Sequence, residues 1–192
     1  MPRTRKNRGI MQIIESAELF AKERYVGRTR NDDTSYLDHL KGVVNRLKNI
    51  GMSDQEVLAA AWLHGIIEET NTTFDEIDKR FGSRIAVLVL ASHKDKNLPR
   101  DKIEKQYIKQ LKESPIEAKI IELCNISTNL KDLKNSTWSK TKKIKQIKKN
   151  LYYLSTIKSE LSSNKIQYPG IQNIINGINE AISTHGQRPI VL

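Results

Sequence analysis

The stretch QEVLAAAWLHGIIEE, residues 55–69, is apolar on nearly every side of a helix. A helix that lacks a polar face is usually buried among other elements of the fold. Ser53 stands just before this stretch, and Glu56 follows Ser53 at the spacing of a capping box, so we expect Ser53 to be the N-cap. The sequence therefore predicts one continuous, central helix that runs through His64 and Gly65.

Apolar residues recur at helical spacing in the rest of the chain as well. Two sets of apolar residues, each forming one face of a helix, predict the first two helices. Gly51 marks the end of the second helix. These faces are formed by Ile10, Ile13, Ile14, Ala17, Phe20 and Ala21, and by Tyr36, Leu37, Leu40, Val43, Val44 and Leu47. Thr73 and Glu76 form a second capping box, before a short helix that ends near Phe81 and Gly82. Further helices are predicted at residues 83–92, 100–113, 116–130, 139–162 and 170–184. No stretch has a convincing strand pattern, so the predicted fold is all-α with about eight to ten helices.

The chain has 192 residues, a length that suits one domain with a sizeable core. We predict a helical domain over residues 1–165, with a C-terminal helix and tail, residues 166–192, packed on the same domain. Cys124 is the single cysteine, which excludes an intrachain disulfide and fits a reducing cytoplasm. No run approaches the roughly 20 apolar residues of a membrane span, so we predict a cytoplasmic protein without membrane contact.

The formal net charge of +11 favours anionic partners such as nucleotides or nucleic acids. The run KTKKIKQIKK, residues 140–149, concentrates this charge. We interpret its lysines as the solvated face of an amphipathic helix whose buried stripe is Ile144, Ile147, Leu151 and Leu154. Nucleic-acid binding is the open alternative. It would rest on phosphate contacts, because the run has no interleaved aromatic residues for base stacking.

His39 and His64 are candidate metal ligands, with Glu68 and Glu69 as nearby acids. Imidazole and carboxylate side chains on packed helices commonly hold divalent ions such as manganese. A neighbouring carboxylate pair can then orient or deprotonate a metal-bound water. Two separated histidines are by themselves more often core residues, so the surrounding sequence has to decide between these interpretations.

The surrounding sequence consists of four segments in order: AELFAKERYVGRTRNDDTSYLDHLKGV (17–43), LAAAWLHGIIEETNTTFDEIDKRFG (58–82), DKNLPR (95–100) and IELCNISTNLKDL (121–133). Together they resemble the hydrolase domain of the RelA/SpoT family, and especially its small stand-alone members such as the metazoan SpoT homologue. A weaker similarity continues near Trp138. The resemblance implies an HD-domain helical bundle. It also implies manganese-dependent removal of pyrophosphate from the 3′ position of guanosine tetraphosphate or pentaphosphate, the nucleotides of the stringent response, and for metazoan members action on NADPH.

The resemblance also assigns a metal site, and this chain departs from the family there. His39 and His64 match the two histidine ligands of the family. Gly65 stands where the family has the aspartate of its histidine-aspartate pair, and Asn125 stands where it has its last aspartate ligand. Both charged ligands of the implied metal site are therefore replaced.

The resemblance implies the remaining site residues too. Glu68 and Glu69 match the catalytic glutamate-aspartate pair, with the second acid longer by a methylene. The ligand-facing positions match Arg30, Arg100, Asn129 and Lys142, with Lys96 as a possible addition. Asn31 replaces a family lysine, and Gln146 replaces a family tyrosine, which argues against stacking of the nucleoside.

The replaced aspartates predict a weak metal site. A hard cation favours oxygen anions, and each aspartate would contribute on the order of a few kcal/mol of attraction. We therefore expect no resident manganese and at most weak zinc binding by the two imidazoles. Gly65 inside a helix would cost about 1 kcal/mol relative to alanine. Three explanations for this glycine are open: drift after lost activity, room for a ligand or partner, and a relocated or metal-independent catalytic site.

The leading hypothesis is a degenerate HD-domain protein, a pseudoenzyme that is catalytically impaired but still binds an anionic nucleotide such as guanosine tetraphosphate or NADPH. One alternative is an active phosphohydrolase for these nucleotides with an atypical metal site. A second alternative is a basic module that binds nucleic acid or protein. The sequence carries no signal for an oligomeric state.

Overall fold

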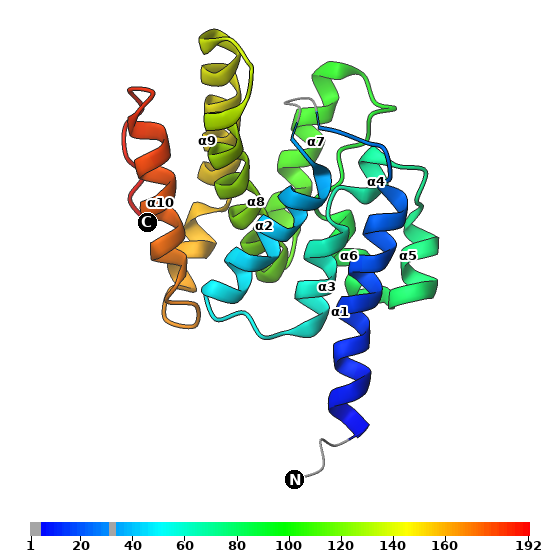
Figure 1. Ribbon diagram of the computed structural model, residues 1–192. Coiled ribbons are helices and arrows are strands. Elements are labelled where there is room, and N and C mark those ends of the chain that lie inside the picture. Colours follow the sequence, from blue (N-terminus) through cyan, green and yellow to red (C-terminus); the bar gives the residue numbers. More distant parts are fainter. Residues whose placement is uncertain (1–4, 31–33) are drawn as a thin grey trace.

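The computed structural model describes residues 5–30 and 34–192. These residues form ten helices and no named strand, which confirms the all-α prediction (Figure 1). In chain order the helices are α1 (Arg5–Arg24), α2 (Tyr36–Asn49), α3 (Gln55–Leu63), α4 (Ile66–Glu69), α5 (Phe74–Phe81), α6 (Ser83–Leu90), α7 (Arg100–Glu113), α8 (Ile116–Asn135), α9 (Lys140–Ser163) and α10 (Ile171–Ser183).

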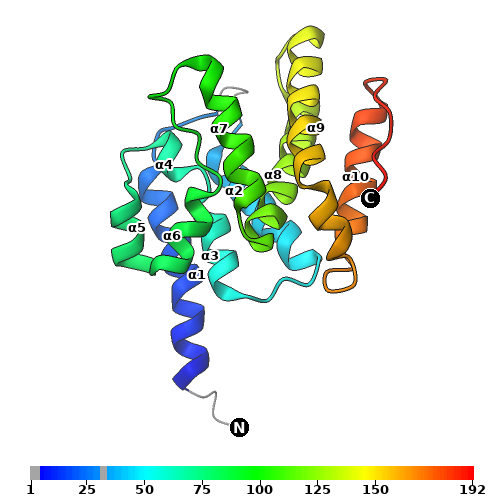
Figure 2. The same cartoon turned by 180° about the vertical axis from the view of Figure 1, so that it is seen from behind.

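Helix α3 is the central helix that the sequence predicts. It packs against α1, α2, α6 and α8, and every residue from Val57 to Leu63 is buried. Figure 2 shows the opposite side of the bundle, where α6 and α7 lie in front. Burial of each large apolar side chain contributes about 1.5–3 kcal/mol, so α3 and its neighbours anchor the fold.

The N-terminus of α3 differs from the prediction, because the N-cap is Asp54 and not Ser53. The Asp54 side chain accepts hydrogen bonds from the backbone N–H groups of Glu56 and Val57. An aspartate caps a helix as well as a serine does, and its charge also pairs with Arg84 at 2.7 Å. The cap therefore lies one residue later than predicted, on a side chain that also pairs with Arg84.

The predicted continuous helix over residues 55–69 is also wrong, because the chain breaks at His64 and Gly65. His64 is extended (φ −61°, ψ 138°), and Gly65 has a left-handed backbone with φ +76°. Glycine adopts this conformation readily because it has no Cβ, so the penalty predicted for a helical glycine does not apply. A Cβ at Gly65 would lie 3.8 Å from the Tyr25 hydroxyl, so there is space for a side chain. The left-handed backbone would nevertheless be strained for most other residues.

The other helix boundaries lie close to the predicted ones. Thr73 caps α5 by accepting from the Glu76 N–H, and Gly51 follows α2 with φ +91°. Helix α8 runs to Asn135 instead of ending near residue 130, because Leu133 continues its buried face. The predicted helices therefore exist, and the errors lie in their ends.

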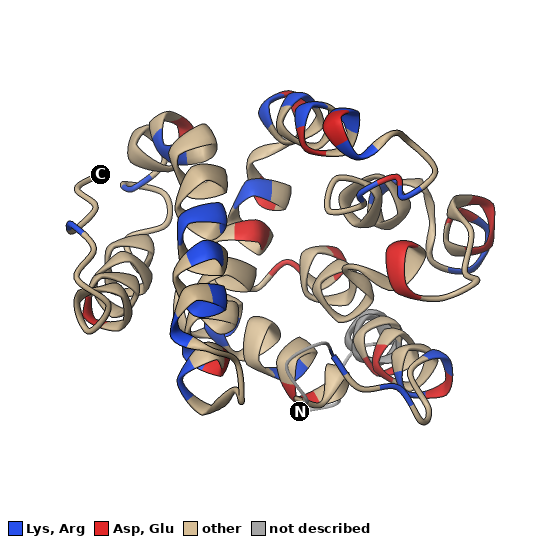
Figure 3. Ribbon diagram, turned by 90° about the horizontal axis from the view of Figure 1, so that it is seen from above, with Lys and Arg blue, Asp and Glu red and all other residues tan. Residues whose placement is uncertain are grey.

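Helix α9 is amphipathic as predicted, but its buried stripe is rotated. Ile147 and Leu154 are buried, whereas Ile144 and Leu151 are only half-buried. The full stripe is Ile147, Asn150, Tyr153, Leu154, Ile157 and Leu161. Figure 3 shows Lys and Arg positions along α9, with few acidic ones. Nucleic-acid binding by this face stays a prediction.

The C-terminal helix α10 packs against α8. The division of the chain at residue 165 stays a prediction, as does the cytoplasmic location. Among the described helices, none is both long enough and apolar enough to cross a membrane.

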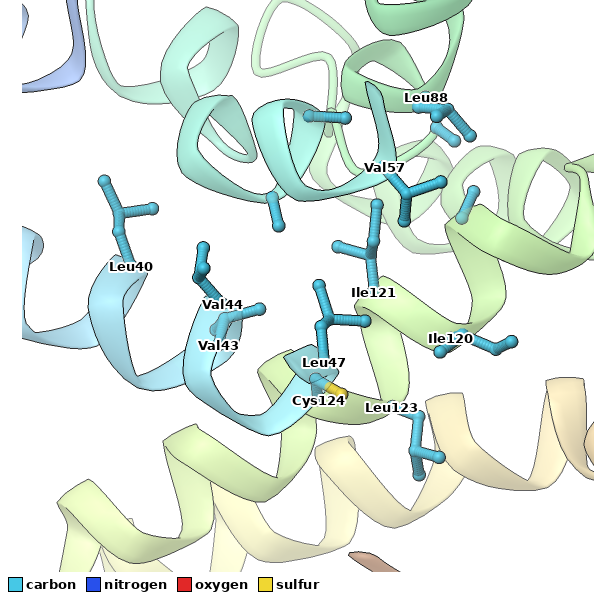
Figure 4. Packing of buried hydrophobic residues seen from close by; sticks show 14 of the residues in the cluster. Leu40, Val43, Val44, Leu47, Val57, Leu88, Ile120, Ile121, Leu123 and Cys124 are labelled. Atoms are coloured by element: carbon cyan, nitrogen blue, oxygen red, sulfur yellow. The ribbon is translucent and has the colours of Figure 1, made fainter. Parts of the chain in front are cut away.

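The packing of α2, α3 and α8 positions the candidate site residues. Leu40 and Leu47 of α2 lie in one core with Val57 of α3 and Cys124 of α8 (Figure 4). Leu40 directly follows His39, and Cys124 directly precedes Asn125. The tight register of this core therefore holds His39 and Asn125 next to each other.

Candidate functional site

A pocket of about 230 Å³ opens between α2, α4, α8 and the loop after α6. Its lining includes most of the site residues predicted from the sequence, namely Arg30, His39, His64, Gly65, Glu68, Glu69, Asn125, Asn129 and Gln146. Residues from distant parts of the chain thus meet where the resemblance places a catalytic site.

His39 and His64 face each other in this pocket. Their Nε2 atoms are 3.3 Å apart, and the two residues are only 6% and 7% exposed. His64 Nδ1 donates to the Ala61 carbonyl oxygen at 2.7 Å. Burial lowers the pKa of His64 to about 3, so this ring is neutral near pH 7 and its Nε2 carries a lone pair.

His39 is oriented by two side chains of α8. Its Nδ1 lies 3.1 Å from Asp132 Oδ2, and its Nε2 lies 3.1 Å from Asn125 Oδ1. Asn125 donates from Nδ2 to Glu122 Oε2 at 2.9 Å, which turns its Oδ1 toward His39. If the Nδ1–H donates to Asp132, lone pairs of His39, His64 and Asn125 converge. Burial lowers the pKa of His39 as well, so this donor set is neutral, and a metal ion between the three atoms would stabilise the arrangement.

The donor set does not fit manganese. In the part of the chain that the structure describes, no group of three or more His, Cys, Asp and Glu side chains could hold a metal ion. His39, His64 and Asn125 offer two neutral nitrogens and one neutral oxygen, whereas manganese favours carboxylates. Zinc accepts imidazole nitrogen readily, so it matches this set better than manganese does.

The acid pair lies on α4 beside the loop after α6. Glu69 accepts a hydrogen bond from the Tyr36 hydroxyl at 3.0 Å and pairs with Lys96 at 3.0 Å. Glu68 accepts from the Lys94 N–H at 3.3 Å, and Lys96 Nζ lies 3.7 Å from its other oxygen. The break at Gly65 turns α4 so that both acids border the pocket.

Arg30 is held at the α8 side of the pocket. Its guanidinium donates to Asp132 at 2.8 Å and to the Asn129 side-chain oxygen at 2.5 Å. Asn129 donates in turn to Asn125 Oδ1 at 3.1 Å. Two of the predicted ligand-facing residues therefore already bond to each other and to the residues around His39.

Other predicted ligand-facing residues do not line this pocket. Arg100 is exposed at the start of α7, away from the lining. Lys142 lies at the edge, with its Nζ 3.8 Å from the centroid of the Trp138 ring, which does line the pocket. Lys96 reaches the pocket only through Glu68 and Glu69. Asn31 lies outside the described residues.

Three important residues are absent from the sequence prediction. Glu122 lies one turn before Asn125 on α8, and Asp132 lies two turns after it, so helical spacing from Asn125 was an available signal for both. Lys94 lines the pocket from the loop after α6. Because a loop has no periodicity, the sequence offered no comparable signal for Lys94.

The helical bundle and the two histidines that face each other in this pocket are features of an HD domain. The HD domain family matches residues 17–154, so this chain belongs to that family. Two similar proteins are the guanosine-3′,5′-bis(diphosphate) 3′-pyrophosphohydrolases MESH1 of Mus musculus and Homo sapiens. They are 36% and 35% identical to this chain over 133 residues, which covers 67% of this chain and 74% of each relative.

Solved structures support the same fold. The structure described as "A metazoan ortholog of SpoT hydrolyzes ppGpp and plays a role in starvation responses" aligns with a TM-score of 0.72 at 22% identity. The alignment covers 91% of this chain and 96% of the other. This likeness supports the fold, whereas the sequence identity to the MESH1 proteins confirms the predicted relationship to the RelA/SpoT hydrolases.

Proposed function

We propose that this chain binds a nucleotide carrying a diphosphate group, with guanosine tetraphosphate as the leading candidate, and that its manganese-dependent hydrolysis is impaired. Membership of the HD family and the similarity to MESH1 proteins support the ligand class. The proposal of impaired hydrolysis rests on one observation: His39, His64 and Asn125 form a neutral donor set, with Gly65 beside it.

The pocket dimensions support binding of the phosphate end of the nucleotide. About 230 Å³ is below the roughly 300–1,000 Å³ that is common for sites that enclose a whole ligand. Gln146 lines the pocket at the position where the resemblance implies a tyrosine, so the base has less to stack on. The diphosphate would enter the pocket, and the base would remain near its rim.

The acid pair alone does not supply a hydrolase. Glu68 or Glu69 can orient a water molecule as a base. Attack on a phosphate also requires stabilisation of developing negative charge, which carboxylates oppose. Without a dication, the retained acids would leave hydrolysis slow even with the nucleotide bound.

Isothermal titration and a turnover assay test this proposal together. Guanosine tetraphosphate and NADPH are titrated into the protein, and release of pyrophosphate or phosphate is followed with added manganese. We expect heat of binding with at least one nucleotide and no turnover above the protein-free rate. Manganese-dependent turnover would overturn the impairment, and the absence of binding by a folded protein would overturn the ligand assignment.

An active hydrolase with an atypical metal is the second candidate. The convergence of His39, His64 and Asn125 lone pairs favours it, because a zinc ion would satisfy all three. Glu68 or Glu69 would then be the water-orienting base. Elemental analysis of protein purified without chelator decides this: near-stoichiometric zinc with turnover would support the candidate, and metal-free protein without turnover would remove it.

A basic binding module is the third candidate, favoured by one feature of α9. Tyr152 is 56% exposed and follows Lys148 by one helical turn, which supplies an aromatic residue that the lysine run itself lacks. A ring beside lysines suits single-stranded nucleic acid. A gel-shift series in increasing salt tests it, and absence of a shift at low salt would remove nucleic acid as the partner.

A further inference from the structure

Lys94 is the unassigned charged residue of the pocket. It lies in the loop between α6 and α7 and lines the pocket together with Glu68 and Asn125. Its Nζ is 4.3 Å from the centroid of the Tyr107 ring and 4.9 Å from that of the Tyr153 ring. A cation over aromatic faces is held by the ring quadrupoles and keeps its N–H donors for an incoming anion.

Lys96, the neighbouring lysine, is used differently. Lys96 forms ion pairs with Glu68 and Glu69, and its side chain is 55% exposed. A charge engaged by two carboxylates and screened by water attracts a phosphate weakly. The loop therefore presents two lysines in different states. Lys96 is held by direct ion pairs with two carboxylates, whereas Lys94 lies over two aromatic rings and has Glu122 as an electrostatic neighbour.

Glu122 gives the positive charge of Lys94 a structural role. Glu122 is 3% exposed, and a buried carboxylate needs a compensating charge or strong hydrogen bonds. Lys94 is an electrostatic neighbour of Glu122, and its positive charge favours the ionised carboxylate. Glu122 in turn accepts from Asn125, which contacts His39. Lys94 is thus linked to the imidazole pair through two side chains of α8.

We propose that Lys94 supplies the positive charge that binds the diphosphate, so that this chain holds its nucleotide without a divalent cation. The proposal rests on nucleotide binding by this pocket, as proposed above. It follows because His64 and Asn125, which meet His39 at Nε2, are neutral, and the Asp132 carboxylate at Nδ1 is already paired with Arg30. Positive charge for the diphosphate therefore has to come from another residue of the chain. Arg30 is the cation on the α8 side, but it is engaged by Asp132 and Asn129.

The test is binding of guanosine tetraphosphate in EDTA, measured by isothermal titration. The variants are Lys94→Met, which keeps much of the apolar stem, and Lys94→Arg, which keeps the charge. Lys79→Met is the matched control, because Lys79 is an exposed lysine of α5 outside the pocket lining. We expect Lys94→Met to weaken binding about 10- to 100-fold, as for loss of one hydrogen-bonded charge, with Lys94→Arg and Lys79→Met within about threefold of wild type.

A folding control is needed, because Lys94→Met leaves Glu122 without its opposing charge. The double variant Lys94→Met/Glu122→Gln restores the charge balance, so we expect it to recover thermal stability without recovering binding. A double variant that regains both would overturn the proposal, since Lys94 would then act only through the structure.

The remaining outcomes separate this proposal from the one on which it rests. Wild-type binding in EDTA with an unchanged Lys94→Met variant overturns the role of Lys94 and leaves nucleotide binding in place. Wild-type binding only after addition of a divalent ion overturns binding without a cation. Absence of binding by wild type under both conditions overturns the proposed function itself.

Discussion

The two sides of the pocket differ in burial and in charge. On the imidazole side, His39 and His64 are almost fully buried. Their facing Nε2 atoms meet neutral Asn125, and the carboxylate on the far side of His39, Asp132, is paired with Arg30. On the acid side, the side chains of Glu68 and Glu69 are 16% and 32% exposed and are paired with a lysine. A buried carboxylate without a cation is strongly destabilising, whereas a partly exposed and paired one is not. The aspartates that the family resemblance implies are missing on the side where, without metal, they would be hardest to retain.

The largest expected effect is a gain of manganese binding when charge returns to the imidazole side. Gly65→Asp combined with Asn125→Asp adds two carboxylates near the paired histidines. We expect manganese affinity to rise on the order of a thousandfold, from the Coulomb attraction of a carboxylate at moderate dielectric. Titration of manganese into wild type and variant measures the change, and hydrolysis of guanosine tetraphosphate is the second readout.

In this double variant, the new carboxylate at position 125 would lie beside Glu122. Asn125 donates to Glu122 at 2.9 Å, so Asn125→Asp places two carboxylates side by side. A triple variant with Glu122→Gln removes this repulsion, and we expect it to bind manganese more tightly than the double variant. Aspartate tolerates a left-handed backbone better than most residues, which suits position 65. Equal, weak binding by all variants would contradict the idea that missing charge is the defect.

The second effect is on stability, because the imidazole side is buried. His39→Ala removes one partner of Asp132 and one of Asn125, which keep Arg30 and Asn129, so their oxygens are less well satisfied. We expect it to lower the free energy of unfolding by about 1–3 kcal/mol, the penalty for a buried polar group that loses its partner. Urea denaturation measures it, and a loss below about 0.5 kcal/mol would show that these bonds contribute little.

Much of the fold could be predicted because helical periodicity is a local signal. The helix at Arg100–Glu113 agrees with the predicted residues 100–113. The break at Gly65 could not be predicted in the same way, because an apolar run looks identical whether one helix or two pass through it. The ion pair of the N-cap Asp54 with Arg84 joins residues that are distant in sequence, so helical periodicity does not reveal it.

The candidate site could be predicted where the helical pattern and the family resemblance support the same residues. His39, His64 and Asn125 meet as expected, because each adjoins a buried stretch of its helix or helix end. Arg100 was placed by resemblance alone, in an exposed position at a helix start, and it does not line the pocket. Lys94 was missed, because loop placement depends on tertiary contacts with Tyr107 and Tyr153.

The third effect is smaller, because the acid side is hydrated. Glu69→Gln keeps an acceptor for the Tyr36 hydroxyl and removes the ion pair with Lys96. We expect the free energy of unfolding to change by less than about 1 kcal/mol, as for a partly exposed ion pair. Thermal and urea denaturation beside His39→Ala measure it. A loss as large as that of His39→Ala would remove the distinction between the two sides.

The smallest expected effect is on an ion pair outside the pocket, and it serves as a reference for the changes in the free energy of unfolding within the pocket. Asp54 is 36% exposed, and its hydrogen bonds with Arg84 hold the pKa of its carboxyl below the ordinary value. The stabilisation is therefore present above the unfolded pKa of about 3.9 and is lost as the pH falls through the lower folded value. Asp54→Asn keeps an N-cap acceptor but removes the charge, so we expect a loss of about 0.2–0.5 kcal/mol near neutral pH that shrinks below about pH 4. Urea denaturation of both proteins across this range measures the difference. A loss that persists in acid would mean that the cap geometry, and not the ion pair, was disturbed.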